Sequence, residues 1–185
     1  MTATFRKIAA LKAAKILRSD GLLAHHTATM PGVAAQPRSK AVQRLCRFKQ
    51  RQGPFLLLAD SVKTALRQAR FYSPALRRLA RSSWPGPVTL IVPARPGLPK
   101  QCYNRGAMAI RVDASIQTRQ LAAQCGGLLL SSSLNRKGER TKNPDRKTQL
   151  RYQRSLHARL IGLTSSGKAS TIIRVWRNHF TTIRP

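Results

Sequence analysis

Four short polar segments along the chain carry side chains suited to binding anions. In the first, Lys49 and Arg51 are separated by one residue at the end of an expected helix. Two cations at this spacing converge on a phosphate chain if the backbone turns between them. The alternative is a solvated helix end, where cations complement the helix dipole. The pair alone therefore indicates a phosphate site only weakly.

The second segment, SSWPGPVTLIVPA at residues 82–94, joins a turn with two prolines to an apolar strand. A rigid turn of this kind presents Thr89 at the start of the strand. The alternative is a purely structural turn that holds Trp84 in the core, which suits most of its residues. Thr89 is thus the one candidate site residue of this segment.

The third segment, AMAIRVD at residues 107–113, places a single arginine inside an apolar strand. A buried arginine is costly unless an anion lies beside it. Asp113 follows two residues later, on the same strand face, so an ion pair with Arg111 is one explanation. An anionic substrate group bound by Arg111 is the other, and the residues alone leave both open.

The fourth segment, LLLSSSLNR at residues 128–136, follows an apolar strand with short polar side chains. Ser131, Ser133 and Asn135 alternate, so an extended chain points them to one side. Their hydroxyl and amide groups are suited to hydrogen bonds with phosphate and ribose. By itself, a serine-rich turn of this kind is usually only a turn.

In order and spacing, these segments resemble the motifs of the YrdC-like threonylcarbamoyl-AMP synthases over nearly the whole chain. The resemblance implies that threonine, bicarbonate and ATP are joined into threonylcarbamoyl-adenylate and pyrophosphate, and that partner proteins then modify a tRNA adenosine. ATP would be a substrate, with Mg²⁺ arriving on its phosphates. The implied ATP-binding residues are Lys49, Arg51, Thr89, Ser131, Ser133 and Asn135, and the implied threonine-binding residues are Thr27 and Arg111.

The first motif of that family, approximately YPTETVYGLG, is altered here to HHTATMPGVA at residues 25–34. Thr27, Thr29 and Gly32 are kept, whereas Ala28 stands where the family has an acid. The segment after Lys49-Gln50-Arg51 is also shortened, and it lacks the Lys or His that the family carries before the next strand. These changes predict that the threonine-binding end of the site departs from the family pattern more than the nucleotide-binding end does. Of the adjacent histidines 25 and 26, at most one faces a groove, where an ordinary hydrogen bond is expected rather than a metal.

Helices and strands alternate without a repeat, which predicts one α/β or α+β domain over residues 1–185. The resemblance implies a twisted mixed sheet with flanking helices around a basic concave groove. The expected helices are 4–18, 41–50 (capped by Ser39), one from Asp60 or Ser61 to about 68, 74–82 and 116–125; the expected strands are 21–26, 55–59, 88–94, 108–112, 127–132, 159–164, 170–176 and 179–183. Residues 27–37 are expected to form a loop, and residues 135–148 a mobile loop.

The net charge of +30, from 35 Lys and Arg against five Asp and Glu, is spread along the chain. A folded body with this charge gains from a polyanionic partner, so we expect contact with RNA, such as tRNA. The alternative is that the high charge serves only to keep the protein soluble. No apolar run approaches the roughly 18 residues of a membrane span. Three scattered cysteines argue against disulfides or zinc and favour a cytoplasmic protein.

Two hypotheses remain. The first is an active synthase, supported by the order of the motifs and by the cations and hydroxyls named above. The second is a non-catalytic or weakly active paralogue that binds double-stranded or structured RNA, supported by the charge and by Ala28. Such RNA binding would be largely electrostatic, because only 5% of the residues are aromatic.

Overall fold

The computed structural model describes residues 7–135, 146–160 and 165–185. Its strands are β1 (Lys7–Ile8), β2 (Leu23–His26), β3 (Pro31–Ala35), β4 (Leu56–Ala59), β5 (Val88–Pro93), β6 (Ala107–Val112), β7 (Leu128–Ser133), β8 (Ala158–Leu160), β9 (Thr171–Trp176) and β10 (His179–Arg184). Its helices are α1 (Ala10–Arg18), α2 (Ser39–Lys49), α3 (Val62–Gln68), α4 (Pro74–Ser83), α5 (Ile116–Gln124) and α6 (Arg146–Ser155), with a short 3₁₀ turn at Lys100–Cys102.

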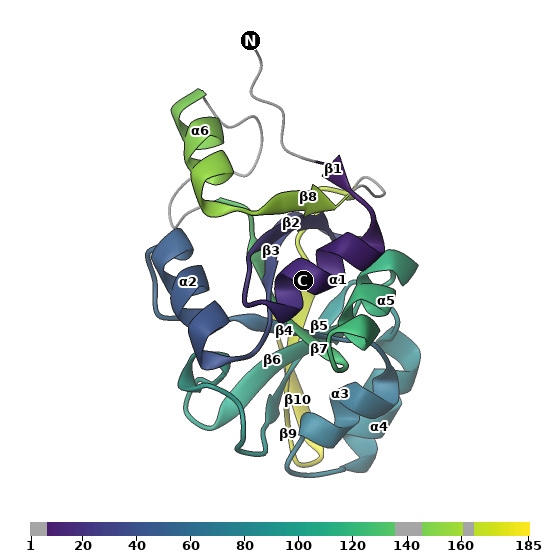
Figure 1. Ribbon diagram of the computed structural model, residues 1–185. Helices are drawn as coiled ribbons and strands as arrows, with labels where there is room; N and C mark the ends of the chain where they lie inside the picture. Colours follow the sequence, from purple (N-terminus) through teal and green to yellow (C-terminus); the bar gives the residue numbers. More distant parts are fainter. Residues whose placement is uncertain (1–6, 136–145, 161–164) are drawn as a thin grey trace.

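The strands form one mixed sheet in the order β1-β8-β2-β3-β7-β4-β6-β5-β9-β10, with helices around it (Figure 1). The predicted mixed sheet with flanking helices is thereby confirmed. Apolar strands in its middle are buried on both faces, because helices pack on both sides. Leu57 packs in a cluster with α2, α3 and α4, whereas Leu58, its neighbour on β4, packs in a second cluster under α1 and α5.

The prediction of a loop over residues 27–37 is wrong, because β3 lies there, between β2 and β7 in the sheet. It runs antiparallel to β2, with His25 opposite Gly32. Pro31 opens the strand, a position that proline tolerates. A Cβ on Gly32 would come within 2.9 Å of the carbonyl oxygen of Ser132, so glycine lets β7 approach closely. Pairing with both neighbours thus outweighs the local turn signals of Pro and Gly.

The helix expected over residues 4–18 begins only at Ala10, because Lys7–Ile8 pair in parallel with β8; residues 4–6 lie outside the described part of the chain. Ser39 is the first residue of α2 and not its cap, since Arg38 occupies the cap position without a side-chain bond. Ser61, in contrast, caps α3 as expected by accepting a hydrogen bond from the Thr64 amide.

Part of the mobile loop expected over residues 135–148 is helical, since α6 begins at Arg146; residues 136–145 lie outside the described residues. The strand expected over 159–164 is present as Ala158–Leu160, and residues 161–164 are likewise outside. In the described ranges, no helix is long and apolar enough to cross a membrane.

The three cysteines are free thiols that are buried in the core. Burial raises the pKa of Cys102 to about 12, and it also raises the pKa values of Cys46 and Cys125. All three therefore remain protonated near neutral pH and act as small apolar side chains.

Candidate functional site

A cavity of about 440 Å³ opens on the face of the sheet that α1 and α5 cover elsewhere. Ser131, in its lining, lies two residues after Leu129, which packs under those helices, so both point to the same side. The cavity receives residues from the β2–β3 turn, the segment after α2, and strands β3, β4, β5, β6, β7, β9 and β10. Of the predicted site residues, the lining includes Thr27, Arg51, Thr89, Arg111, Ser131, Ser133 and Asn135.

Lys49 does not line the cavity; it is buried beside it. Its ammonium group donates to the carbonyl oxygens of Ser133 (2.6 Å) and Asn135. Gln50 ends α2 in a left-handed conformation, with φ of 52°, and turns the chain as the KQR hypothesis required. The two cations thereby separate: Lys49 holds the backbone of the serine segment, residues 131–135, and Arg51 reaches the cavity.

The Arg51 guanidinium is held from three sides. It donates to the carbonyl oxygen of Pro54 (3.0 Å) and to the hydroxyl of Ser132 (3.3 Å). Its central carbon lies 4.7 Å from the centre of the Phe55 ring, in a cation–π contact. Burial lowers the pKa of Arg51 from its ordinary value. A cation that is partly stripped of water and fixed in place is suited to a phosphate group.

Arg111 forms the ion pair that was one of its two explanations, and its guanidinium also lies at the cavity. It is 2% exposed, and its guanidinium lies 2.9 Å from the carboxylate of Asp113, which confirms the ion pair. The same guanidinium donates to the hydroxyl of Thr29 (2.9 Å) and faces the cavity. Burial lowers the pKa of Arg111, and Asp113 opposes that shift. Asp113 is itself fixed by the amides of Ala28 and Ser115.

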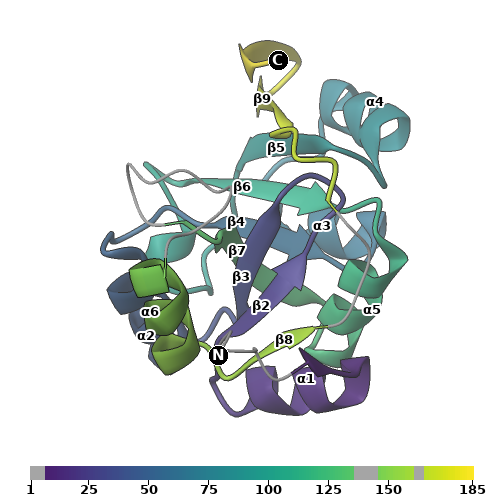
Figure 2. The same ribbon diagram turned by 90° about the horizontal axis from the view of Figure 1, so that it is seen from above.

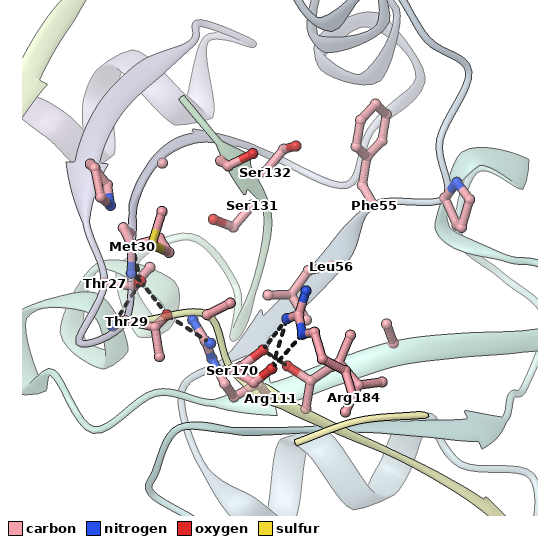
Figure 3. A pocket seen from close by; sticks show the side chains of 18 of the residues that line it. Thr27, Thr29, Met30, Phe55, Leu56, Arg111, Ser131, Ser132, Ser170 and Arg184 are labelled. Atoms are coloured by element: carbon pink, nitrogen blue, oxygen red, sulfur yellow. Dashed lines mark hydrogen bonds between the residues drawn. The ribbon is translucent and has the colours of Figure 1, made fainter. Parts of the chain in front are cut away.

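The β2–β3 turn brings two threonines to this end of the cavity (Figure 3). The hydroxyl of Thr27 donates to the carbonyl of Met30 (2.8 Å) and lies 3.0 Å from the hydroxyl of Thr29. Thr27 therefore shapes the turn, while Thr29 touches Arg111 directly. Thr29 was visible in the sequence as a retained motif residue but was not among the predicted ligands.

Two further lining residues, Ser132 and Arg184, were missed. Strict alternation excluded Ser132, yet its hydroxyl holds Arg51. Arg184 donates to the carbonyl oxygen of Ser170 from two nitrogens (3.0 and 2.7 Å; Figure 3). The hydroxyl of Ser170 lies 3.0 Å from that of Thr89. No sequence signal distinguishes Arg184 among so many cations; the β9–β10 ladder brings it opposite Ile172 at the cavity.

Neither His25 nor His26 lines the cavity. His25 is buried, with its Nε2 3.1 Å from the Ser131 hydroxyl, and burial is the main cause that lowers its pKa to about 3. His26 is partly buried; its Nε2 accepts from Arg159 (2.8 Å), and its Nδ1 lies 3.2 Å from the Ser165 hydroxyl. In the ranges that the structure describes, no three His, Cys, Asp or Glu side chains gather as metal ligands do.

The described lining thus holds three arginines, 51, 111 and 184, with several hydroxyls and no carboxylate. Such a lining attracts anions, and its two ends differ. Arg51 and the serine segment form one end, and Arg111 with Thr29 forms the other. Together they offer separate positions for a phosphate chain and for a smaller anion such as a carboxylate.

The chain matches the Sua5, YciO and YrdC family, described as "Telomere recombination", over residues 15–185. It is 36% identical over 126 residues to a threonylcarbamoyl-AMP synthase of Thiobacillus denitrificans, covering 66% of this chain and 67% of the relative. It is 34% identical over 157 residues to the synthase of that name from Nitrosococcus oceani, covering 80% of each.

Among solved structures, P. abyssi Sua5 in complex with L-threonine is similar to this fold, with a TM-score of 0.86 at 20% identity. The match covers 99% of this chain but only 57% of that protein. At this identity the likeness concerns the fold.

Proposed function

Since the chain belongs to the Sua5, YciO and YrdC family, we propose that it is a threonylcarbamoyl-AMP synthase, which joins threonine, bicarbonate and ATP for tRNA modification. The family predicted from the four segments is thereby confirmed. The observation that carries the proposal is the two-ended cavity, with Arg51 and the serine segment at one end and Arg111 at the other. Its size and charge suit a nucleotide and an amino acid together.

At the nucleotide end, the phosphates of ATP would lie between Arg51 and the serine segment. Ser131, Ser133 and Asn135 would supply short hydrogen-bonding groups there, with Thr89 across the cavity. Lys49 would act through the backbone, because it anchors the carbonyls of Ser133 and Asn135. The attack on the α-phosphate needs positioned cations more than a covalent nucleophile, since charge builds on the phosphate oxygens.

At the other end, Arg111 would bind the threonine carboxylate, with Thr27 shaping the turn beside it. Three arginines without a carboxylate in the described lining disfavour a further positive charge, so the threonine amine would be held neutral. A neutral amine is the form that captures carbon dioxide, which bicarbonate gives by taking up a proton and losing water, and the amine releases a proton as the carbamate forms. The resulting carbamate is an anion that the same arginines attract, and its oxygen then attacks the α-phosphorus as pyrophosphate leaves.

The described lining does not fit a protein-bound magnesium ion. Mg²⁺ prefers carboxylate and water ligands, whereas this lining offers arginines, hydroxyls and one amide. The nearby carboxylate of Asp113 is already used by Arg111 and two backbone amides. A magnesium ion would thus arrive bound to ATP.

The test is pyrophosphate release from ATP, with threonine and bicarbonate each omitted in turn. We expect release only when both are present, and release that continues without threonine refutes the proposal. Arg111→Lys keeps the charge but loses the planar fork, so it should raise the KM for threonine far more than that for ATP. Arg77→Lys on the exposed face of α4 is the matched control and should change neither.

A second candidate function is the binding of structured RNA without catalysis. The net charge of +30 and Ala28 in place of the family's acid favour it. Binding of tRNA should then weaken steeply as salt is raised, because contacts to phosphates release counterions. A protein that binds tRNA in this way but releases no threonine-dependent pyrophosphate would support this candidate over the synthase.

A further inference from the structure

The β9–β10 hairpin exposes large apolar side chains at the edge of the sheet. Trp176, Phe180 and Ile183 are 57%, 57% and 51% exposed, although most side chains of this size lie in the core. On this hairpin only Val175 is buried in the main hydrophobic cluster. In Figure 2 the hairpin, in yellow, stands at the rim of the molecule beside β5. Folding of the core therefore does not account for these exposed side chains.

Trp176 belongs to a row of side chains on one face of the hairpin that leads out of the cavity, whereas Phe180, which pairs with Val175, lies on the other face. Trp176 and His179 are direct partners across the two strands, so their side chains share one face. Arg174 lies two residues before Trp176 and points to that face as well, as does Ile172 at the cavity. At about 3.3 Å per residue, Trp176 lies roughly 13 Å from Ile172. The row thus continues the floor of the cavity.

The charge of residues 165–185 indicates which kind of partner binds the β9–β10 hairpin. Residues 165–185 contain Lys168, Arg174, Arg177 and Arg184 but no Asp or Glu. A second copy of the chain, which also carries +30, would be repelled here. The fitting partner is an anion that also offers flat apolar faces.

We propose that the β9–β10 hairpin binds single-stranded RNA, with a base stacked on Trp176 and the adjoining phosphates on Arg174 and Arg177. Stacking on an aromatic platform requires unstacked bases, which a duplex does not offer. The strand would run along the hairpin toward the cavity. Aromatic stacking is thereby added to the diffuse electrostatic contact expected from the net charge.

The first test is the affinity of a fluorescein-labelled, mixed-sequence 12-nucleotide RNA, measured by anisotropy at physiological salt. Trp176→Ala should weaken binding by about 5-fold to 100-fold, the range that removal of one stacked base predicts. Trp176→Phe retains a ring and should stay within a few-fold of the wild type. Phe71→Ala, at a 46% exposed aromatic outside the hairpin, is the matched control and should bind normally.

The second test uses the two tryptophans of the chain, since Trp84 is buried and Trp176 is exposed. The RNA should quench the fluorescence of the wild type, and Trp176→Phe should lose that quenching. Trp176→Ala should keep the thermal midpoint and the threonine-dependent pyrophosphate release of the wild type, which separates this surface from the proposed catalytic cavity.

Three results would overturn the proposal. The first is a Trp176→Ala variant that binds the RNA as tightly as Phe71→Ala. The second is a duplex of the same sequence that binds equally well and is equally sensitive to Trp176→Ala. The third is a wild-type dimer in sedimentation that Trp176→Ala dissociates while RNA affinity stays unchanged, because the hairpin would then be a contact between copies.

Discussion

Replacement of Asp113 by asparagine should destabilise the protein strongly, because it leaves Arg111 buried without its anion. The two groups are 2.9 Å apart, and their side chains are 3% and 0% exposed. At an effective dielectric constant of about 20, the gross attraction is about 6 kcal/mol. Removal of one partner of a buried pair costs about 3–5 kcal/mol, since the remaining charge stays desolvated. We expect a loss near the lower end, because asparagine keeps one oxygen for the Ala28 and Ser115 amides.

The assay is equilibrium unfolding in urea at pH 7, which gives the free energy of unfolding for each variant. Asp60→Asn is the control, since Asp60 makes no ion pair among the residues described. The double variant Arg111→Met with Asp113→Asn should recover part of the loss, because no buried charge remains. If Asp113→Asn costs less than about 1 kcal/mol, as the control should, then the ion pair does not hold Arg111 in place and the account of the threonine end fails.

Three further outcomes are expected. Burial lowers the pKa of His25 from 6.5 to about 3, so the unfolded chain binds the proton first as the pH falls. This group's contribution to stability is full above pH 6.5 and should fall by about 2.5 kcal/mol between pH 7 and 4.5, a slope that His25→Asn removes in urea titrations. Gly32→Ala should cost about 1–3 kcal/mol in thermal unfolding, because its Cβ would press on the Ser132 carbonyl. Arg51→Ala should raise the KM for ATP about tenfold or more, whereas Arg47→Ala, exposed on α2, should leave it unchanged.

Sequence alone predicted the parts of the fold that depend on local pattern. The run at residues 55–59 is apolar throughout, and it forms a central strand buried on both faces. Ser61 caps its helix for the same local reason, a hydroxyl placed three residues before a free amide. The β3 strand could not be predicted in this way. Its proline and glycine indicate a turn, and only its partners β2 and β7, far apart in the chain, make it a strand.

The residues of the candidate site differ in the same way: local pattern predicts some of them, and others depend on contacts between distant segments. Alternation and the cost of a buried charge made an ion pair with Asp113 one of two explanations for Arg111, because Asp113 directly follows the strand that holds Arg111. The position of Lys49 against the backbone near Ser133 depends on contacts between residues more than 80 positions apart. Arg184 reaches the cavity only through the pairing of the last two strands, which no single segment reveals.

The close approach of β3 to β7 has an evolutionary consequence. A Cβ at position 32 would lie 3.1 Å from the Ser131 hydroxyl and 3.3 Å from Nε2 of His25, so three positions from two separate motifs share one small space. In the related family the residue at position 25 is a tyrosine, whereas here it is a histidine that contacts Ser131. A change at any of these positions alters the room for the other two. We therefore expect residues 25, 32 and 131 to covary across relatives. Substitutions at positions 25 or 32 of the first motif should be accompanied by substitutions at position 131.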